Sequence, residues 1–239
     1  MRLASALFVG LLAAPACAQA APATARPQIP AHQDTVALLG AQSVRSGPTT
    51  GDAVVAHVKA HGTMTRARTV LPVLGQSIDS TGGSWLQVRL PGRTLKGTQP
   101  PATGWISAAN TRASATDWHL VVNRRARSVT AYNNGRRVHS YKAIVGKRST
   151  PTPRGEFFVE ENVRLPGGRS GAPFALATSA RSKVFQEFEG GPGQIALHGL
   201  THVGGTLGTA VSHGCVRLAN RSISWLAARI KPGDPVTIV

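Results

Sequence analysis

Short β-type runs separated by turn residues dominate the chain from residue 52 onwards and limit what it can fold into. The run Trp85–Leu90 alternates apolar and polar side chains, which is the pattern of a half-buried strand. An Asn134-Gly135 pair between two further runs predicts a hairpin, because both residues tolerate positive φ. One stretch, Ser222–Ile230, has helical periodicity. The sequence therefore predicts a mainly β protein with one C-terminal helix.

The first twenty residues have the features of a secretory signal peptide. A positive charge at Arg2 precedes an apolar run, and Ala18 and Ala20 then form an A-x-A site. The run is shorter than the roughly 20 residues that a membrane-spanning helix needs. We therefore expect export to the cell wall, the periplasm or the extracellular space, with cleavage after Ala20 or, as second choice, after Ala18. A lipid anchor at Cys17 is the alternative.

The chain is strongly basic, with 27 Lys and Arg residues against 10 Asp and Glu and a formal net charge of +17. Such a balance is typical of proteins that have an anionic partner. Nucleic acid is not expected, since an exported protein rarely meets it and the sequence contains no nucleic-acid-binding motif. Anionic cell-wall polymers are the better candidate, and a coding bias towards Arg and Ala is the alternative explanation. No stable protein partner is inferred.

Composition divides the remaining chain into three parts. Residues 21–51 are rich in Ala, Pro, Thr, Gln and Ser, which predicts a flexible tether. Residues 52–113 offer short strands for a small β barrel. Residues 117–239 are numerous enough for a β-rich domain with its own core.

Cys215 is the only thiol that remains once a signal peptide carrying Cys17 is removed. It therefore has no partner for an internal disulfide. An unpaired thiol in an exported protein is a liability unless its reactivity is used. A buried, inert cysteine is the alternative, but the Gly-rich surroundings with two nearby histidines favour a reactive thiol.

His198 is the candidate base for this thiol, because it ends an apolar run that holds its backbone firmly. Proton transfer from Cys215 to the imidazole would leave a thiolate–imidazolium pair. The carbonyl of Gly199 is placed to fix the ring tautomer. Gly214 lets the backbone approach a substrate carbonyl, and the amides around Gly214 and Cys215 are expected to supply an oxyanion hole. His213 would line that hole or position the loop, and a purely structural role is the alternative.

The His198-Gly199 pair followed by Ser212-His213-Gly214-Cys215-Val216-Arg217-Leu218 resembles the L,D-transpeptidases with a YkuD-type catalytic domain. Thr150–Gly155 and Gly233–Ile238 match as well, so the resemblance covers 117–239. It implies that a cysteine takes the acyl group of a peptidoglycan stem tetrapeptide and releases the terminal D-alanine. An amine of a neighbouring stem then resolves the thioester and leaves a cross-link. No cofactor and no metal are expected.

The resemblance also implies a role for each matching position. Cys215 is the nucleophile, His198 is the base, and Arg217 binds or orders near the substrate. The remaining positions of the motif shape the site: Ser212, His213 and Gly214. Leu200 stands where many members have Thr, and Arg217 where one branch has Asn, which affects substrate detail rather than the chemistry.

Residues 52–113 resemble the bacterial SH3-like modules that target enzymes to the cell wall. The matching segments are Thr65–Arg68, Trp85–Val88 and Gly104–Ile106. Trp85 and Trp105 are interpreted as core aromatics rather than as ligand platforms.

Several other functions fit parts of the sequence. A zinc site is one, since the possible ligands are His198, His202, His213 and Cys215. Gly199 argues against the helix that usually carries a His-x-x-x-His pair. Papain-like peptidases place the Cys before the His, and sortase-type transpeptidases separate the two more widely. An L,D-carboxypeptidase on the same scaffold and a non-catalytic wall-binding protein are the remaining alternatives to a cross-linking L,D-transpeptidase.

Overall fold

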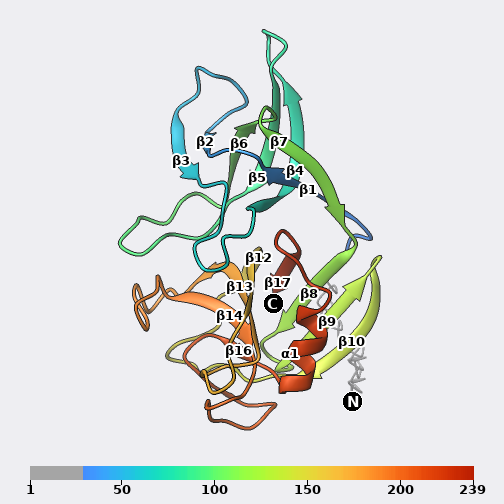
Figure 1. Cartoon of the computed structure of the whole chain (residues 1–239), viewed down its shortest axis with the longest axis vertical. Helices are drawn as coiled ribbons and strands as arrows, with labels where there is room; N and C mark the ends of the chain where they lie inside the picture. The colour runs from blue at the N-terminus through green and yellow to red at the C-terminus, as the bar shows by residue number, and fades with distance from the viewer. Residues whose placement is uncertain (1–28) are drawn as a thin grey trace, which may run out of the picture.

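The computed structural model describes residues 29–239 and confirms a mainly β architecture with one helix. Two large sheets follow one another along the long axis of the molecule (Figure 1). The predicted signal peptide at 1–20 and the alternative lipid anchor at Cys17 lie outside the described residues. In the part of the chain that is described, no helix is long and apolar enough to span a bilayer.

The N-terminal sheet has seven strands in the order β3-β2-β6-β5-β4-β1-β7, and every neighbouring pair is antiparallel. The strands are β1 (Gln33–Leu38), β2 (Gln42–Arg45), β3 (Val54–Val58), β4 (Val70–Ile78), β5 (Ser84–Arg89), β6 (Thr103–Ser107) and β7 (Thr111–Thr116). The alternating run predicted as a strand is β5, and its side chains Trp85 and Val88 are buried. This confirms the strand that was predicted from the alternation of apolar and polar residues.

The prediction of a tether over residues 21–51 is wrong for β1 and β2. Val36, Leu38 and Val44 are buried in the core of the N-terminal sheet. β1 lies between β4 and β7, so its apolar side chains find partners much further along the chain. The sheet thus begins at Gln33 and ends at Thr116, beyond both ends of the predicted barrel at 52–113.

The C-terminal sheet has eight strands in the order β10-β9-β8-β17-β12-β13-β14-β16. They are β8 (Trp118–Asn123), β9 (Ser128–Asn133), β10 (Arg136–Lys142), β12 (Gly155–Arg164), β13 (Phe174–Arg181), β14 (Gln194–His198), β16 (Val216–Arg217) and β17 (Pro235–Ile238). A small parallel pair joins β11 (Val145–Gly146) to β15 (Ala210–Ser212). We call residues 117–239 the catalytic half.

The hairpin and the helix predicted from the sequence are both present. Asn134 and Gly135 connect β9 to β10 with φ of 51° and 68°, as a turn of this kind requires. The helix α1 (Asn220–Ala227) begins two residues earlier than predicted and buries Ile223 and Leu226. It covers one face of the C-terminal sheet (Figure 1).

The two halves meet along β12, which carries a bulge. Val159 pairs with Thr178 and Glu161 pairs with Ala177, so Glu160 is an additional residue in the strand. Consecutive residues of a strand point to opposite faces, and Phe158 and Val159 are both buried because each face of β12 is covered by a core. Phe158 enters the core of the N-terminal sheet, whereas Val159 enters the core of the catalytic half.

Candidate active site

A cleft of about 1210 Å³ lies between the two halves and contains the predicted thiol and base. Cys215, His198, His213 and Arg217 line it from the catalytic half. The N-terminal sheet contributes the opposite wall, with β3 and the loop after it. The structure therefore brings the residues of the two separate sequence segments into one cavity.

The pairing of β14 with β16 explains why the thiol and the imidazole line the same cleft. The strands are parallel, with His198 opposite Arg217, and Cys215 comes directly before β16. Along β14 the side chains of Ile195 and Leu197 are buried, whereas those of Gln194, Ala196 and His198 are only half-buried. Alternate residues of a strand share a face, and Gln194 and His198 of this second set line the cleft.

The ring of His198 is held in one tautomer by its own neighbour. Its Nδ1 lies 2.8 Å from the carbonyl oxygen of Gly199, so Nδ1 carries the hydrogen and Nε2 carries the lone pair. Burial lowers the pKa of His198, and the positive charge of Arg217 acts in the same direction. The imidazole is therefore neutral at neutral pH and able to accept a proton. The contribution expected of Gly199 is thus present.

The thiol of Cys215 donates to the carbonyl oxygen of Gln194 over 3.8 Å. Burial raises the pKa of the Cys215 thiol, while the backbone N–H of Ala196 acts in the opposite direction. With the thiol pKa raised and the imidazole pKa lowered, both groups are neutral at rest. Burial penalises the charge on each of the two groups, and the thiolate–imidazolium pair expected from the sequence stays a prediction.

Ser212 fixes the loop that carries the thiol. Its buried hydroxyl donates to the carbonyl oxygen of Cys215 at 2.5 Å and accepts from the N–H of Gly214 at 3.1 Å. Gly214 has a φ of 126°, a conformation that favours glycine. Since the Gly214 N–H is already bonded, the prediction that it contributes to an oxyanion hole is wrong for this conformation.

Two threonines from the segment before β12 donate hydrogen bonds to the loop that carries Cys215. Thr150 donates through its hydroxyl to the carbonyl oxygen of Ser212 at 3.2 Å, and Thr152 donates to that of Gly214 at 2.8 Å. Both threonines are buried. The Thr-Pro-Thr-Pro segment is therefore a support for the cysteine loop.

His213 lies on the outer side of the cleft with an exposed ring. The rings of Phe185 and Phe188 lie 5.9 and 5.8 Å from it, centroid to centroid. Lys147 approaches its Nε2 at 3.4 Å. These contacts connect His213 to the loop between β13 and β14. They are consistent with a residue that lines the wall of the cleft.

Arg217 lies on the same side of the cleft as His198. Its guanidinium donates to the carbonyl oxygen of Gly204, and its buried Nε has no partner among the described residues. This places a positive charge beside the thiol and the imidazole, where the sequence resemblance expects a substrate-ordering group.

Two glycines allow the backbone to pack tightly around His198. A Cβ at Gly199 would lie 2.0 Å from the carbonyl oxygen of Ala172, and one at Gly171 would lie 2.8 Å from Nδ1 of His198. Gly171 belongs to the loop between β12 and β13, and its carbonyl accepts from the Gly199 N–H at 2.8 Å. This end of the loop is tied to the base.

The possible zinc ligands do not gather into a metal site. Among residues 29–239, no group of three or more His, Cys, Asp and Glu side chains is close enough to hold a metal ion. His202 sits in a turn with positive φ after β14, so no helix presents it together with His198.

Sequence reasoning missed Gln194, whose carbonyl accepts from the thiol, and the buried pair Glu160 and Arg181 beside it. The length of β14 could have indicated Gln194. In a strand that begins at Gln194 and ends at His198, the two residues are four positions apart and lie on the same face. Nothing in the local sequence marked Glu160, because its hydrogen-bond partners lie far along the chain.

Residues 117–238 match a family model described as the YkuD L,D-transpeptidase catalytic domain. Over 121 residues the chain is 34% identical to a putative L,D-transpeptidase YkuD of Bacillus subtilis and 33% identical to one of Bacillus licheniformis. Each alignment covers 51% of this chain and 65% of the relative, so the chain spans less than two thirds of the length of the curated relatives it matches.

Solved structures with a similar chain include two L,D-transpeptidases from mycobacteria. One from Mycobacterium smegmatis is 17% identical, with coverage of 71% of this chain and 99% of that one and a TM-score of 0.41. One from Mycobacterium tuberculosis is 17% identical, with coverage of 70% and 93% and a TM-score of 0.42.

Proposed function

Because the chain belongs to the family of YkuD-type L,D-transpeptidase catalytic domains, we propose that it is a cysteine acyltransferase that cross-links peptidoglycan stem peptides. The observation that carries the proposal is the paired placement of β14 and β16. It sets a thiol and a neutral imidazole of fixed tautomer along one cleft.

The first half of the proposed reaction forms a thioester. Nε2 of His198 takes the proton of Cys215 as the sulfur bonds to the acyl carbon of a stem tetrapeptide. The bond from that carbon to the nitrogen of the terminal D-alanine breaks, and the proton passes from His198 to the leaving amine. A neutral thiol and a neutral imidazole suit this concerted transfer.

The second half restores the enzyme. The amine of a neighbouring stem attacks the thioester and gives up a proton to His198, and the new amide forms as the carbon–sulfur bond breaks. The proton then returns to the sulfur. If water attacks instead, the product is a free carboxylate, and the protein is an L,D-carboxypeptidase.

Five further features belong to the proposal. Residues 1–20 direct export to the cell wall, the periplasm or the medium, and the basic charge favours anionic wall polymers. The N-terminal sheet is the wall-targeting, SH3-like part. Arg217 orders the substrate beside the thiol, and Ser212, His213 and Gly214 shape the pocket.

Mass spectrometry of the intact protein with a disaccharide-tetrapeptide tests the proposed activity. We expect an adduct on Cys215 with loss of D-alanine, and no adduct on the folded variants Cys215→Ala and His198→Ala. The reaction products then separate cross-linking from hydrolysis. A folded protein that binds wall material but forms no adduct would instead support the non-catalytic alternative.

A further inference from the structure

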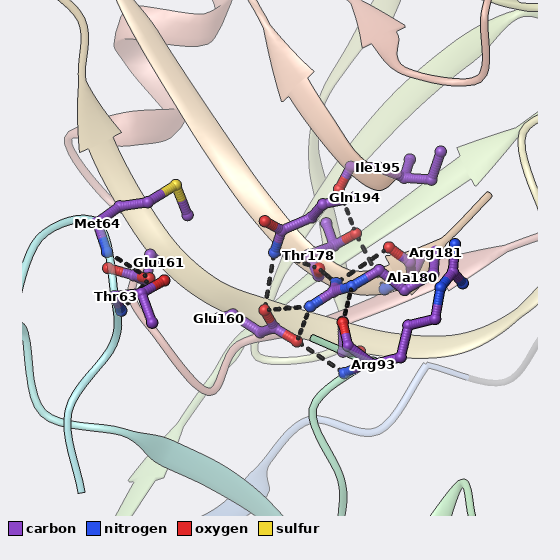
Figure 2. Close-up of polar contacts among 12 residues, drawn as sticks. Thr63, Met64, Arg93, Glu160, Glu161, Thr178, Ala180, Arg181, Gln194 and Ile195 are labelled. Carbon is purple, nitrogen blue, oxygen red and sulfur yellow. Dashed lines mark hydrogen bonds and ion pairs between the residues drawn. The ribbon is translucent and has the colours of Figure 1, made fainter. Parts of the chain in front are cut away.

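Glu160 and Glu161 are consecutive residues of β12 that contact the N-terminal half in different ways. Figure 2 shows their carboxylates at the centre of two separate clusters of hydrogen bonds. Regular alternation places Glu160 on the same face as Phe158, and the bulge between Val159 and Glu161 lets the next residue, Glu161, face the N-terminal half as well.

The hydrogen bonds of the Glu161 carboxylate all go to the N-terminal half. Its carboxylate accepts from the backbone N–H groups of Thr63, Met64 and Thr65 at 3.0, 3.2 and 2.7 Å, and from the Thr65 hydroxyl at 2.6 Å. All four donors belong to the loop after β3. None of them touches the catalytic residues described above.

Glu160 connects the N-terminal half to the catalytic strand. It accepts from the N–H of Gly92 at 2.8 Å, from Arg181 at 3.0 and 3.2 Å, and from the side-chain amide of Gln194 at 2.7 Å. Its side chain is 16% exposed and that of Arg181 is 6% exposed. Charged hydrogen bonds in such a site are stronger than those at a surface.

Arg93 fastens the same corner from the N-terminal half. Its guanidinium donates to the carbonyl oxygens of Ser182, Phe185 and Gln186 at 3.3, 2.9 and 3.4 Å. Its own carbonyl accepts from Arg181 at 2.9 Å. The loop between β13 and β14, which packs its phenylalanines against His213, is therefore held by a residue outside the catalytic half.

One residue separates this cluster from the thiol. The side-chain amide of Gln194 donates to Glu160 and to the carbonyl oxygen of Thr178, at 2.7 and 2.9 Å. The backbone carbonyl of the same Gln194 accepts from the Cys215 thiol. Gln194 also starts the strand that His198 ends, so its placement affects both partners.

We propose that Glu160 is a positioning residue that, clamped by Gly92 and Arg181, holds Gln194 so that its carbonyl fixes the Cys215 thiol in the cleft. Docking of the N-terminal half through residues 92–93 thereby sets the reactivity of the nucleophile. The inference rests on the proposed function in that Cys215 is the reacting group.

The variant Glu160→Gln keeps the size of the side chain but replaces one acceptor oxygen by an amide that faces donors. The matched control is Glu161→Gln, which weakens the other contact between the halves on the adjacent residue. Two rates are measured for each protein: alkylation of Cys215 by iodoacetamide, and acylation by a disaccharide-tetrapeptide. Thermal unfolding gives Tm for all of them.

A released thiol is more accessible to a small reagent but less well placed for a peptide. In Glu160→Gln we expect alkylation to rise about fivefold and acylation to fall about tenfold. In Glu161→Gln we expect both rates to stay within about twofold of the parent, although Tm falls. Gln194→Met, which lacks the amide but keeps the backbone carbonyl, should behave as Glu160→Gln does.

Equal changes in the two glutamate variants would reduce Glu160 to a docking contact and overturn the proposal, as would unchanged rates in both Glu160→Gln and Gln194→Met. If Glu160→Gln does not fold, Gln194→Met alone decides. Alkylation needs no stem peptide, so a rise in Glu160→Gln that is absent from Glu161→Gln supports the positioning role even if the parent protein forms no acyl adduct. In that case the proposed function fails separately.

Discussion

The two hydrophobic cores of the molecule differ in where their residues come from. The core of the catalytic half has 18 buried residues, all from positions 120–238. That of the N-terminal sheet has nine, and the largest of them, Phe158, is supplied by β12 of the catalytic half. The N-terminal sheet therefore depends on its neighbour to complete its core, whereas the catalytic half does not depend on the N-terminal sheet in this way.

Phe158→Ala is expected to have the largest effect, because it removes the shared side chain. Truncation of a buried Phe costs about 3–5 kcal/mol, and Phe158 is 1% exposed. The loss should fall on the N-terminal sheet, which would exchange its amide hydrogens faster while the catalytic half stays protected. Hydrogen exchange with mass spectrometry measures this.

The matched control is Phe157→Ala, one residue earlier and packed against the core of the catalytic half instead. Because Phe157 is only partly buried, its truncation should cost less and leave the protection of the N-terminal sheet unchanged. Equal loss of protection in both halves of the Phe158 variant would contradict the asymmetry.

Asp234 is expected to make the stability of the protein depend on pH. It is 2% exposed, and burial raises its pKa from the ordinary 3.8 to about 6. The folded state then binds the proton more tightly than the unfolded state, so stability is highest below about pH 4 and falls as the pH rises to 6. The loss is on the order of 3 kcal/mol.

Asp234→Asn should abolish this part of the pH dependence. The free energy of unfolding in urea, measured from pH 4 to pH 7, is the readout. Relative to the parent, the variant should gain stability as the pH rises. An unchanged difference between the two proteins across that range would show that Asp234 does not titrate in this window.

Gly199→Ala addresses the close packing of the catalytic half. Its Cβ would lie 2.0 Å from the carbonyl oxygen of Ala172, so the backbone that carries His198 must shift, at about 1–3 kcal/mol. We expect a lower Tm together with slower acylation. Gly204→Ala, where a Cβ meets nothing within 4 Å, is the control and should change neither.

The smallest expected effect is a shift in the pH profile of acylation, at the pH where the rate falls on the acidic side. Because burial lowers the pKa of His198 below its ordinary value of 6.5, the imidazole stays neutral to a lower pH. The half-maximal rate on the acidic side should therefore lie below pH 6.5. A half-maximal rate above pH 6.5 would place His198 in a less buried environment than the cleft provides.

Local patterns in the sequence were enough to predict the parts of the fold that depend on neighbouring residues. The turn at Asn134-Gly135 and the helix α1 were predicted because their signals lie within a few positions. The strand β1 was missed, since Val36 pairs with Leu71 and Ala113. A short apolar run within a polar composition looks like a tether until those distant partners are known.

The site divides in the same manner. Cys215 and His198 stand in recognisable segments, and their placement along one cleft follows from parallel pairing of those segments. Glu160, Arg181 and Gln194 come from three strands, and irregular pairing sets their positions. No spacing in a sequence encodes a bulge of this kind, so the cluster around Gln194 could not have been predicted.

The neutral state of the cysteine also bears on how long the protein lasts. Oxidants attack the thiolate, and the first product, a sulfenic acid, leads on to irreversible sulfinic and sulfonic acids. A thiol whose pKa is raised by burial and whose hydrogen is held by the Gln194 carbonyl offers little thiolate between turnovers. We therefore expect the resting cysteine to react slowly with oxidants, and to react faster once its proton has moved to the base.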